Sequence, residues 1–352
     1  MKLDGNDILK EVTRRFAEQS NDFPRNGTVD YPKLVEGWVG KLNADVLPYI
    51  TAGSIAADGT GHLTMHDREH VERVRQVAAD LIAESDTIDL SPFEMTLLLI
   101  SIYLHDLGNV MGRMGHERNI NQVLKAANAM PPVDTVEYAV AKRIAGVHGG
   151  TVNGSKDTIT TIAEREPVSG RIIRSRLLAA ILRLADELAD DVARANRVQI
   201  ATGMLPRGSE VYHVVAAGLH SQMPTGRTRE IELSYSFYDA GVFLRMLGKG
   251  TGEVHLLDEI FARSIKTFEE ARYCSRFMRP FLEFERVNVD IVIFDDDHEL
   301  LHQIRYVIAE HGYAMSSGTI YDLVPELDKY NGNGRLTPEH LEKIITEAKG
   351  AR

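Results

Sequence analysis

Cysteine is almost absent from this sequence: Cys274 is the single example in 352 residues. One cysteine excludes an internal disulfide framework and a metal cage built from thiolates. Any metal site must therefore use histidine, aspartate and glutamate. The N-terminal stretch MKLDGNDILKEV also lacks the apolar core of a secretory signal peptide, so we expect a cytoplasmic protein.

Long apolar runs and an excess of positive charge are missing as well. No stretch of 18 apolar residues occurs, so no membrane-spanning helix is predicted. The formal net charge of −11 disfavours non-specific binding to nucleic acid, because the release of counterions requires a basic surface. A hydrophobic content of 43% is sufficient for the cores of two or three domains, and the sequence shows no internal repeat.

Helical periodicity dominates up to about residue 200. Apolar residues recur three and four positions apart in a series of segments, and Ser91 with Glu94 forms the sequence pattern of a capping box. The predicted helices cover 6–20, 32–50, 65–85, 91–106, 118–130, 133–150 and 172–195. This region, 1–200, is predicted to be a helical bundle with its core at 60–200.

The region 201–352 is predicted to be a smaller α+β accessory domain. VYHVVAAGL (211–219) and REIELSYSFY (229–238) alternate like strands, with turns at 203–209 and 220–228. A long amphipathic helix is expected at 255–283, followed by a buried strand at 288–297 and helices at 298–312 and 338–349. The fold class expected is therefore mainly α, with strands confined to the C-terminal part at about 209–240 and in a terminal αβ unit at 288–352.

The most informative polar pair is His105-Asp106, which follows the apolar run MTLLLISIYL. Aspartate is seldom buried unless it is paired or binds a cation, and neutral imidazole is the commonest protein ligand for metals. A His-Asp dipeptide also occurs by chance or as a surface cap. Its significance depends on what surrounds it.

Two other apolar helices carry residues of the same chemistry. His70 lies near the start of one predicted helix, and Asp186 lies in LLAAILRLADELADD, where an aspartate without a partner would be costly. His66 competes with His70, because MHDREH contains a second His-Asp pair, His66-Asp67.

These pieces together resemble the HD-domain superfamily of metal-dependent phosphohydrolases. The resemblance covers about 60–200 and rests on HxxRV at His70, on His105-Asp106 in LHDLG and on Asp186 in RLADEL. It implies that His70, His105, Asp106 and Asp186 bind one metal ion. It also favours His70 over His66. His66 and Asp67 are then expected at the mouth of the site with a catalytic role, unless they only cap the helix.

The same resemblance implies a second metal ion. His116 in GHERN and His148 in GVHGG lie where members with two metals place their additional histidines, with Asp106 as the bridging residue. A lone histidine can also simply pack in a core. A histidine and carboxylate set suits Mn²⁺, Fe²⁺, Co²⁺, Ni²⁺, Zn²⁺ or Mg²⁺.

A phosphate substrate would also need cationic side chains, and arginines are concentrated in the acidic chain at REPVSGRIIRSRLLAAILR. The alternative is an ordinary solvated helix face whose arginines pair with neighbouring glutamates. The candidates for substrate binding are Arg118, Lys142, Arg174, Arg183 and Arg194, the last expected on the helical face of Asp186; Arg113 is a further catalytic candidate.

The function implied is hydrolysis of a nucleotide or another phosphomonoester or phosphodiester by metal-activated water, with a phosphorylated small molecule as the partner. HGG replaces the GYP element after His148, so hydrolysis of cyclic dinucleotides is not supported, and the segment around Asp186 looks more like the HD modules of bacterial conflict and defence proteins. Two alternatives stay open: a nuclease acting on single strands, and a degenerate module that binds a nucleotide and regulates a partner. The accessory region could cover the pocket or form a homo-oligomer contact.

Two further resemblances are weaker. The stretch from 288 onward starts like a receiver domain, but too few residues follow, so a fortuitous strand, turn and helix is expected. NGNGRLTPEHL is similar to a calcium loop, but Lys329 and His340 occupy ligand positions, so no calcium binding is expected.

Overall fold

The computed structural model describes residues 7–50, 68–85, 87–112, 116–190, 192–310, 319–332 and 334–350. These residues divide into two compact units, which we call unit 1 and unit 2. Unit 1 consists of the described residues up to Ala189 together with Tyr273–Glu283. Unit 2 consists of Asp190–Arg272 and the described residues from Phe284 onward.

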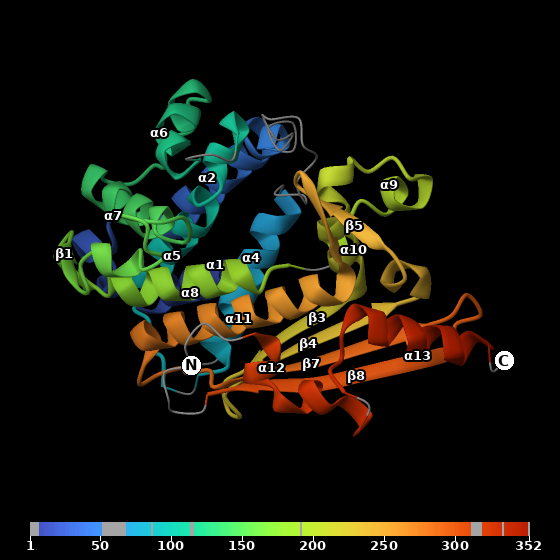
Figure 1. Cartoon of the computed structure of the whole chain (residues 1–352). Coiled ribbons are helices and arrows are strands. Elements are labelled where there is room, and N and C mark those ends of the chain that lie inside the picture. The colour runs from blue at the N-terminus through green and yellow to red at the C-terminus, as the bar shows by residue number, and fades with distance from the viewer. Residues whose placement is uncertain are drawn as a thin grey trace. The chain divides into compact units, whose positions relative to one another are not determined.

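Unit 1 is built around helix α5 (Pro92–Leu104), all of whose residues are buried. The capping box predicted at its start is present, with Ser91 and Glu94 each bonded to the other's backbone N–H. The helices that contact α5 are α1 (Ile8–Glu18), α2 (Tyr31–Asp45), α4 (Arg68–Ala83), α7 (Thr135–Gly146) and α8 (Ser175–Glu187) (Figure 1). Helix α6 (His116–Ala126) packs on the 3₁₀ helix η5 (Leu107–Met111).

Side-chain hydrogen bonds fix α5 relative to its neighbours. The Tyr103 hydroxyl donates to Glu72 of α4 at 2.6 Å, and the Ser101 hydroxyl donates to the Ala141 carbonyl of α7 at 3.0 Å. Because these bonds lie close to the C-terminal end of α5, they fix that end of α5 against α4 and α7. The described helices confirm the predicted helical character of this region.

A short hairpin precedes α8 and was not predicted. Strand β1 (Glu166–Val168) pairs antiparallel with β2 (Arg171–Ile173), and the two turn residues, Ser169 and Gly170, both have positive φ. Such a turn matches the twist of a tight hairpin. The helix predicted over 172–195 is therefore shorter at both ends.

Unit 2 contains a four-stranded sheet in the order β3-β4-β7-β8. Strands β3 (Leu219–Thr225) and β4 (Glu230–Phe237) are antiparallel, β4 and β7 (Arg286–Phe294) are parallel, and β7 and β8 (Leu300–Ala309) are antiparallel. Alternate residues of these strands are buried, which gives the sheet an apolar face. Figure 1 shows the sheet in yellow to red with α11 (Leu256–Met278) alongside it, and the Ser264 hydroxyl of α11 lies 2.9 Å from that of Tyr306 on β8.

The remaining elements of unit 2 are short, apart from the C-terminal helix. They are η7 (Val192–Arg194), α9 (Arg197–Thr202), α10 (Glu210–Gly218), the hairpin β5 (Met246–Lys249) with β6 (Gly252–His255), α12 (Ile320–Leu323) and α13 (Pro338–Gly350). Unit 2 also contains the 3₁₀ helices η8 (Arg207–Ser209), η9 (Ala240–Phe243) and η10 (Pro325–Gly332). Those of unit 1, besides η5, are η2 (Ser20–Asp22), η3 (Pro24–Gly27), η4 (Leu47–Tyr49) and η6 (Ile159–Thr161). The chain is mainly α, with an α+β region in its C-terminal part.

Two predicted elements of unit 2 have the wrong type. The segment 211–219, expected as a strand, forms α10, and the expected turn that follows it is β3. A short run of valines flanked by buried residues on all sides carries no periodicity that separates helix from strand.

The segment 298–312, expected as a helix, contains strand β8. Buried Ile304, Tyr306 and Ile308 alternate with more exposed residues, which is the period of a strand paired with β7. The acidic cluster after β7 makes the connecting turn, where the Asp295 carboxylate accepts hydrogen bonds from the N–H groups of Asp297 and Glu299. No helix follows β7 directly, so the likeness to a receiver domain ends at one strand.

Among the described residues, no single helix has the length and apolar character to cross a membrane; one pair bent by 90°, Pro92–Met111 with His116–Ala126, meets the criterion by length and composition only.

Candidate metal centre

The structure brings six predicted ligands together, and all belong to unit 1. Each lies at or near the end of a helix, where a side chain can reach a common point. They are His70 in the first turn of α4, His105 and Asp106 directly after α5, His116 at the start of α6, His148 just after α7 and Asp186 in the last turn of α8.

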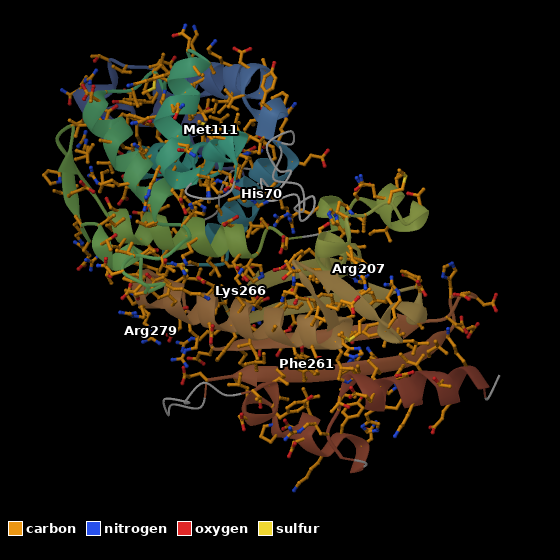
Figure 2. All side chains as sticks on the ribbon, turned by 45° about the horizontal axis from the view of Figure 1, so that its top comes forward. His70, Met111, Arg207, Phe261, Lys266 and Arg279 are labelled. Atoms are coloured by element: carbon orange, nitrogen blue, oxygen red, sulfur yellow. The ribbon has the colours of Figure 1, made fainter. Side chains whose placement is uncertain are left out.

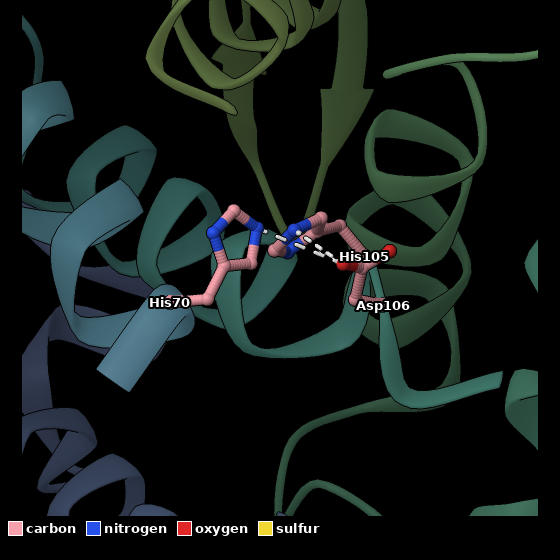
Figure 3. Close-up of side chains that lie close together, drawn as sticks. All are labelled: His70, His105 and Asp106. Carbon is pink, nitrogen blue, oxygen red and sulfur yellow. Dashed lines mark ion pairs between the residues drawn. The ribbon is translucent and has the colours of Figure 1, made fainter. Parts of the chain in front are cut away.

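The first group consists of His70, His105 and Asp106 (Figure 3), with Asp186 beside it. The Asp106 Oδ2 atom lies 3.7 Å from His70 Nε2 and 3.5 Å from His105 Nε2. The Asp186 Oδ1 atom lies 3.1 Å from His70 Nε2 and 3.7 Å from His105 Nε2. Two imidazole nitrogens therefore face two carboxylate oxygens at distances that could accommodate one metal ion between them.

The second group consists of Asp106, His116 and His148. The Asp106 Oδ1 atom lies 3.3 Å from His116 Nε2 and 3.9 Å from His148 Nε2, and these two nitrogens are 3.5 Å apart. The two oxygens of Asp106 therefore face different groups, Oδ2 the first and Oδ1 the second.

The tautomers of two histidines are set by backbone carbonyls. His105 Nδ1 lies 2.6 Å from the Ile102 carbonyl, and His148 Nδ1 lies 2.5 Å from the Ala145 carbonyl. A carbonyl only accepts, so each Nδ1 carries the proton and each Nε2 keeps its lone pair. His105 Nε2 is buried and has no hydrogen-bond partner among the described residues, so its lone pair is available to a metal ion.

The electrostatics of the site favour the protonation states that bind a metal. Burial lowers the pKa of His148, and the nearby His105 lowers it further, so the ring is neutral at pH 7. Burial alone would raise the pKa of Asp186. The hydrogen bond with His70 and the electrostatic interaction with His105 outweigh this effect and hold the pKa of Asp186 well below its usual range, so its carboxylate is ionised at pH 7.

Gly108 sets the position of His116. A Cβ atom at residue 108 would lie 1.8 Å from the His116 carbonyl oxygen, which no side chain can tolerate. The turn after His105-Asp106 can therefore contact the start of α6 only because residue 108 is glycine.

The buried histidine and aspartate groups could hold a metal ion, and the comparisons with known proteins agree with this chemistry. A family model described as HD-CE matches residues 60–235, which is half of the chain. The chain belongs to the HD-CE family. This is an HD-type module, so the resemblance inferred from the motifs is confirmed at the family level. No curated protein matches the chain.

The cationic residues predicted to bind substrate in this HD-CE chain are dispersed. Arg118 is exposed on α6, two positions from His116 and so on a different face of the helix, and Lys142 is half-buried on α7. Arg174 precedes α8 and pairs with Glu94 at 2.7 Å, at the opposite end of that helix from Asp186. The structure does not bring Arg174 to the metal ligands.

Arg183 and Arg194 have contacts that hold the chain together. Arg183 is buried, donates to the Lys156 carbonyl at 3.0 Å and lies over the ring of Tyr273. The prediction that Arg194 shares a helical face with Asp186 is wrong, because α8 ends at Glu187 and Arg194 belongs to η7 in unit 2. Its side chain pairs with Asp190.

Three catalytic candidates, His66, Asp67 and Arg113, lie outside the described residues. The structure instead indicates two residues that sequence reasoning missed. Asn109 is only 4% exposed, and neither its Oδ1 nor its Nδ2 has a hydrogen-bond partner among the described residues. The backbone N–H of Asn109 donates to the Asp106 carbonyl at 2.9 Å, which places Asn109 close to Asp106.

The second missed residue is Glu117. Its Oε1 atom lies 3.9 Å from His116 Nδ1, the ring nitrogen that faces away from Asp106. A carboxylate at that position favours a proton on Nδ1 and leaves Nε2 for a metal. In the sequence, the signal for Glu117 was its position directly after the candidate ligand His116.

Proposed function

We propose that this HD-CE protein is a metal-dependent phosphohydrolase that cleaves a nucleotide or another phosphomonoester or phosphodiester. The observation that carries the proposal is the shared carboxylate. Asp106 faces two histidine pairs through different oxygens, with distances of 3.3 to 3.9 Å. A structural ion pair would need only one of these pairs, whereas a two-metal centre needs both.

One divalent ion would be held by His70, His105, Asp106 and Asp186, and a second by Asp106, His116 and His148. When bound, two such ions lower the pKa of a shared water and neutralise charge that develops on phosphorus. The donor set of imidazole nitrogens and carboxylate oxygens suits first-row transition metals and Mg²⁺.

The side chains of the chain itself supply orientation. The carbonyls of Ile102 and Ala145 fix the rings of His105 and His148, so little reorganisation is needed when a ligand binds. Glu117 acts on His116 only through its charge, because its Oε1 atom lies 3.9 Å from His116 Nδ1. The side-chain amide of Asn109, which has no hydrogen-bond partner among the described residues, offers an acceptor oxygen and an NH₂ donor close to Asp106, suited to holding a water or a phosphoryl oxygen.

Recognition of the non-reacting part of the substrate is less specified. Arg118 and Lys142 remain candidates to contact phosphate oxygens, because the other three predicted cations, Arg174, Arg183 and Arg194, bond to other parts of the chain. The net charge of −11 favours a small phosphorylated substrate over single-stranded nucleic acid.

A hydrolysis screen tests the proposal, with phosphate or pyrophosphate release measured for the nucleoside phosphates and chromatography of the products for the phosphodiesters. The substrates are nucleoside mono-, di- and triphosphates, cyclic dinucleotides and single-stranded oligonucleotides, each with Mn²⁺, Mg²⁺, Co²⁺ or Ni²⁺. We expect turnover that is lost in Asp106→Asn and unchanged in His220→Ala, whose side chain is exposed on β3 in unit 2. Cleavage of oligonucleotides alone would favour the nuclease, and metal binding without any product would favour a regulatory nucleotide-binding module.

A further inference from the structure

A second polar pocket lies in unit 1, at the N-terminal end of α8. It has a volume of about 300 Å³, at the lower limit for small-molecule sites. Its lining is dominated by arginine: Glu164, Arg165, Arg174, Arg176, Leu177, Arg276, Phe277, Arg279 and Phe281. We call it the arginine pocket.

The arginine pocket is positively charged, whereas the chain as a whole is negatively charged. Five arginines and one glutamate line it, a formal charge of +4, whereas the whole chain carries −11. Three of the arginines have a carboxylate neighbour outside the lining: Glu94 for Arg174, Asp157 for Arg276 and Glu283 for Arg279. Even with these three included, five positive charges face four negative ones.

Hydrogen bonds hold two guanidinium groups in place but use only some of their N–H donors. Arg174 uses Nε and Nη2 to bond Glu94 and the Asp89 carbonyl, and Arg176 uses the same two nitrogens to bond the carbonyls of Ile162 and Thr160. In both side chains Nη1 has no hydrogen-bond partner among the described residues. Two rigid N–H pairs are therefore available without the entropic cost of ordering a flexible side chain.

Two other arginines are weakly held. The nearest carboxylate oxygen to the Arg276 guanidinium is 3.9 Å away, and its remaining contacts are with the rings of Tyr273 and Phe277. Arg165 is exposed and forms no ion pair with the described part of the chain. Arginines gathered without matching carboxylates repel one another, and an anion relieves that repulsion.

This pocket is separate from the metal centre. Arg174 precedes the first residue of α8, and Asp186 lies in its last turn. At 1.5 Å per residue the two are about 18 Å apart along the helix axis. In Figure 2 Arg279 and His70, which belong to the same unit, lie well apart.

We propose that the arginine pocket binds a small ligand that carries two or more phosphate groups, such as a nucleoside triphosphate or inorganic triphosphate. Guanidinium groups pair with phosphate oxygens in bidentate fashion, and several converging arginines exceed what a single phosphate requires. This site is independent of hydrolysis at Asp106, so the protein would bind one phosphorylated ligand without transforming it.

Isothermal titration calorimetry on the full chain, stripped of metal with EDTA, tests the proposal. The probes are inorganic triphosphate, ATP and inorganic sulfate at physiological salt. We expect triphosphate or ATP to bind at least tenfold more tightly than sulfate. The affinity should be unchanged in Asp106→Asn, so a failure of the catalytic proposal leaves this result intact.

Substitutions assign the binding to the pocket. Arg276→Ala and Arg165→Ala should each weaken triphosphate binding by about tenfold, the effect of losing one charged hydrogen bond. Arg305→Ala is the matched control, because Arg305 is 70% exposed on β8 in unit 2. The proposal is overturned if triphosphate and sulfate bind equally, if none of the probes binds, or if Arg305→Ala weakens binding as much as Arg276→Ala does.

Discussion

Asp106 is the residue on which both ligand groups depend, since its two oxygens face different histidine pairs. Asp106→Asn keeps the shape but replaces one oxygen by a nitrogen that does not ligate and removes the charge. We expect this variant to lose both metal ions. His116→Ala should lose only one, because the first group keeps His70, His105, Asp106 and Asp186.

Metal content measured by elemental analysis after dialysis distinguishes these variants. The expected order is two equivalents for the unmodified chain, one for His116→Ala and fewer than one for Asp106→Asn. Equal loss in both variants would show that the two groups do not bind separately.

Gly108 supports a second prediction, which concerns the position of His116 and not a direct bond to the metal. A methyl group at residue 108 would overlap the His116 carbonyl oxygen, so Gly108→Ala must displace the start of α6. We expect loss of the second metal equivalent and a destabilisation of about 1–3 kcal/mol from the forced backbone shift. Gly146→Ala is the control, because no atom lies within 4 Å of the added carbon there. Unchanged metal content in Gly108→Ala would contradict this account.

Single residues also show how far the sequence could predict the site. His70, His105, Asp106 and Asp186 stood out because histidine and aspartate are costly in apolar helices, whereas His116 and His148 followed only from the resemblance to the HD superfamily. Asn109 and Glu117 did not, since an asparagine in a turn and a glutamate on a helix are ordinary. That the Asn109 amide is buried without a hydrogen-bond partner in the described part of the chain became visible only in the structure.

At the level of elements, the ion pair between Glu94 and Arg174 joins the start of α5 to the start of α8. Glu94 is 2% exposed, and its carboxylate accepts from Ser91 and from Arg174. Burial alone would raise the pKa of Glu94, but the bonds and charge of Arg174 outweigh it and lower the pKa below the ordinary value of 4.5. The pair therefore contributes stability above pH 4.5 that is lost as the pH falls toward the depressed pKa.

Glu94→Gln removes this charge and leaves Arg174 without its counterion. We expect the variant to lose about 3 kcal/mol of unfolding free energy at pH 7, as for breaking a largely buried pair. In urea titrations the difference from the unmodified chain should shrink below pH 4.5. Glu285→Gln, in the exposed pair with Arg229, should change stability by less than about 1 kcal/mol. A difference for Glu94→Gln that does not vary with pH would exclude this linkage.

Elements with a clear period were predictable, and ambiguous ones were not. The helices of unit 1 carry apolar stripes and caps, so their type followed from the sequence. The valine run of α10 fits a buried helix or strand equally, and its type is set by tertiary packing. In β8 the alternation of buried residues was present, but the expectation of a helix after an acidic turn overrode it.

At the scale of the whole molecule, all six candidate metal ligands belong to unit 1. A ligand that binds the folded state stabilises it by about 2.7 kcal/mol when its concentration is a hundred times the Kd. Removal of metal with EDTA should therefore lower the melting temperature, and Mn²⁺ or Zn²⁺ should restore it. Asp106→Asn should show no response to either treatment.

The location of the ligands predicts where this stabilisation appears. Bound metal ions would join the ends of α4, α5, α6, α7 and α8, so local opening of these helices would break metal bonds. Hydrogen exchange measured by mass spectrometry should show slower exchange with metal in peptides from these helices. Peptides from β3, β4, β7 and β8 contain none of the ligands and should exchange at the same rate with and without metal. Equal protection in both units would show that the metal acts on the fold as a whole and not through the six residues at the helix ends.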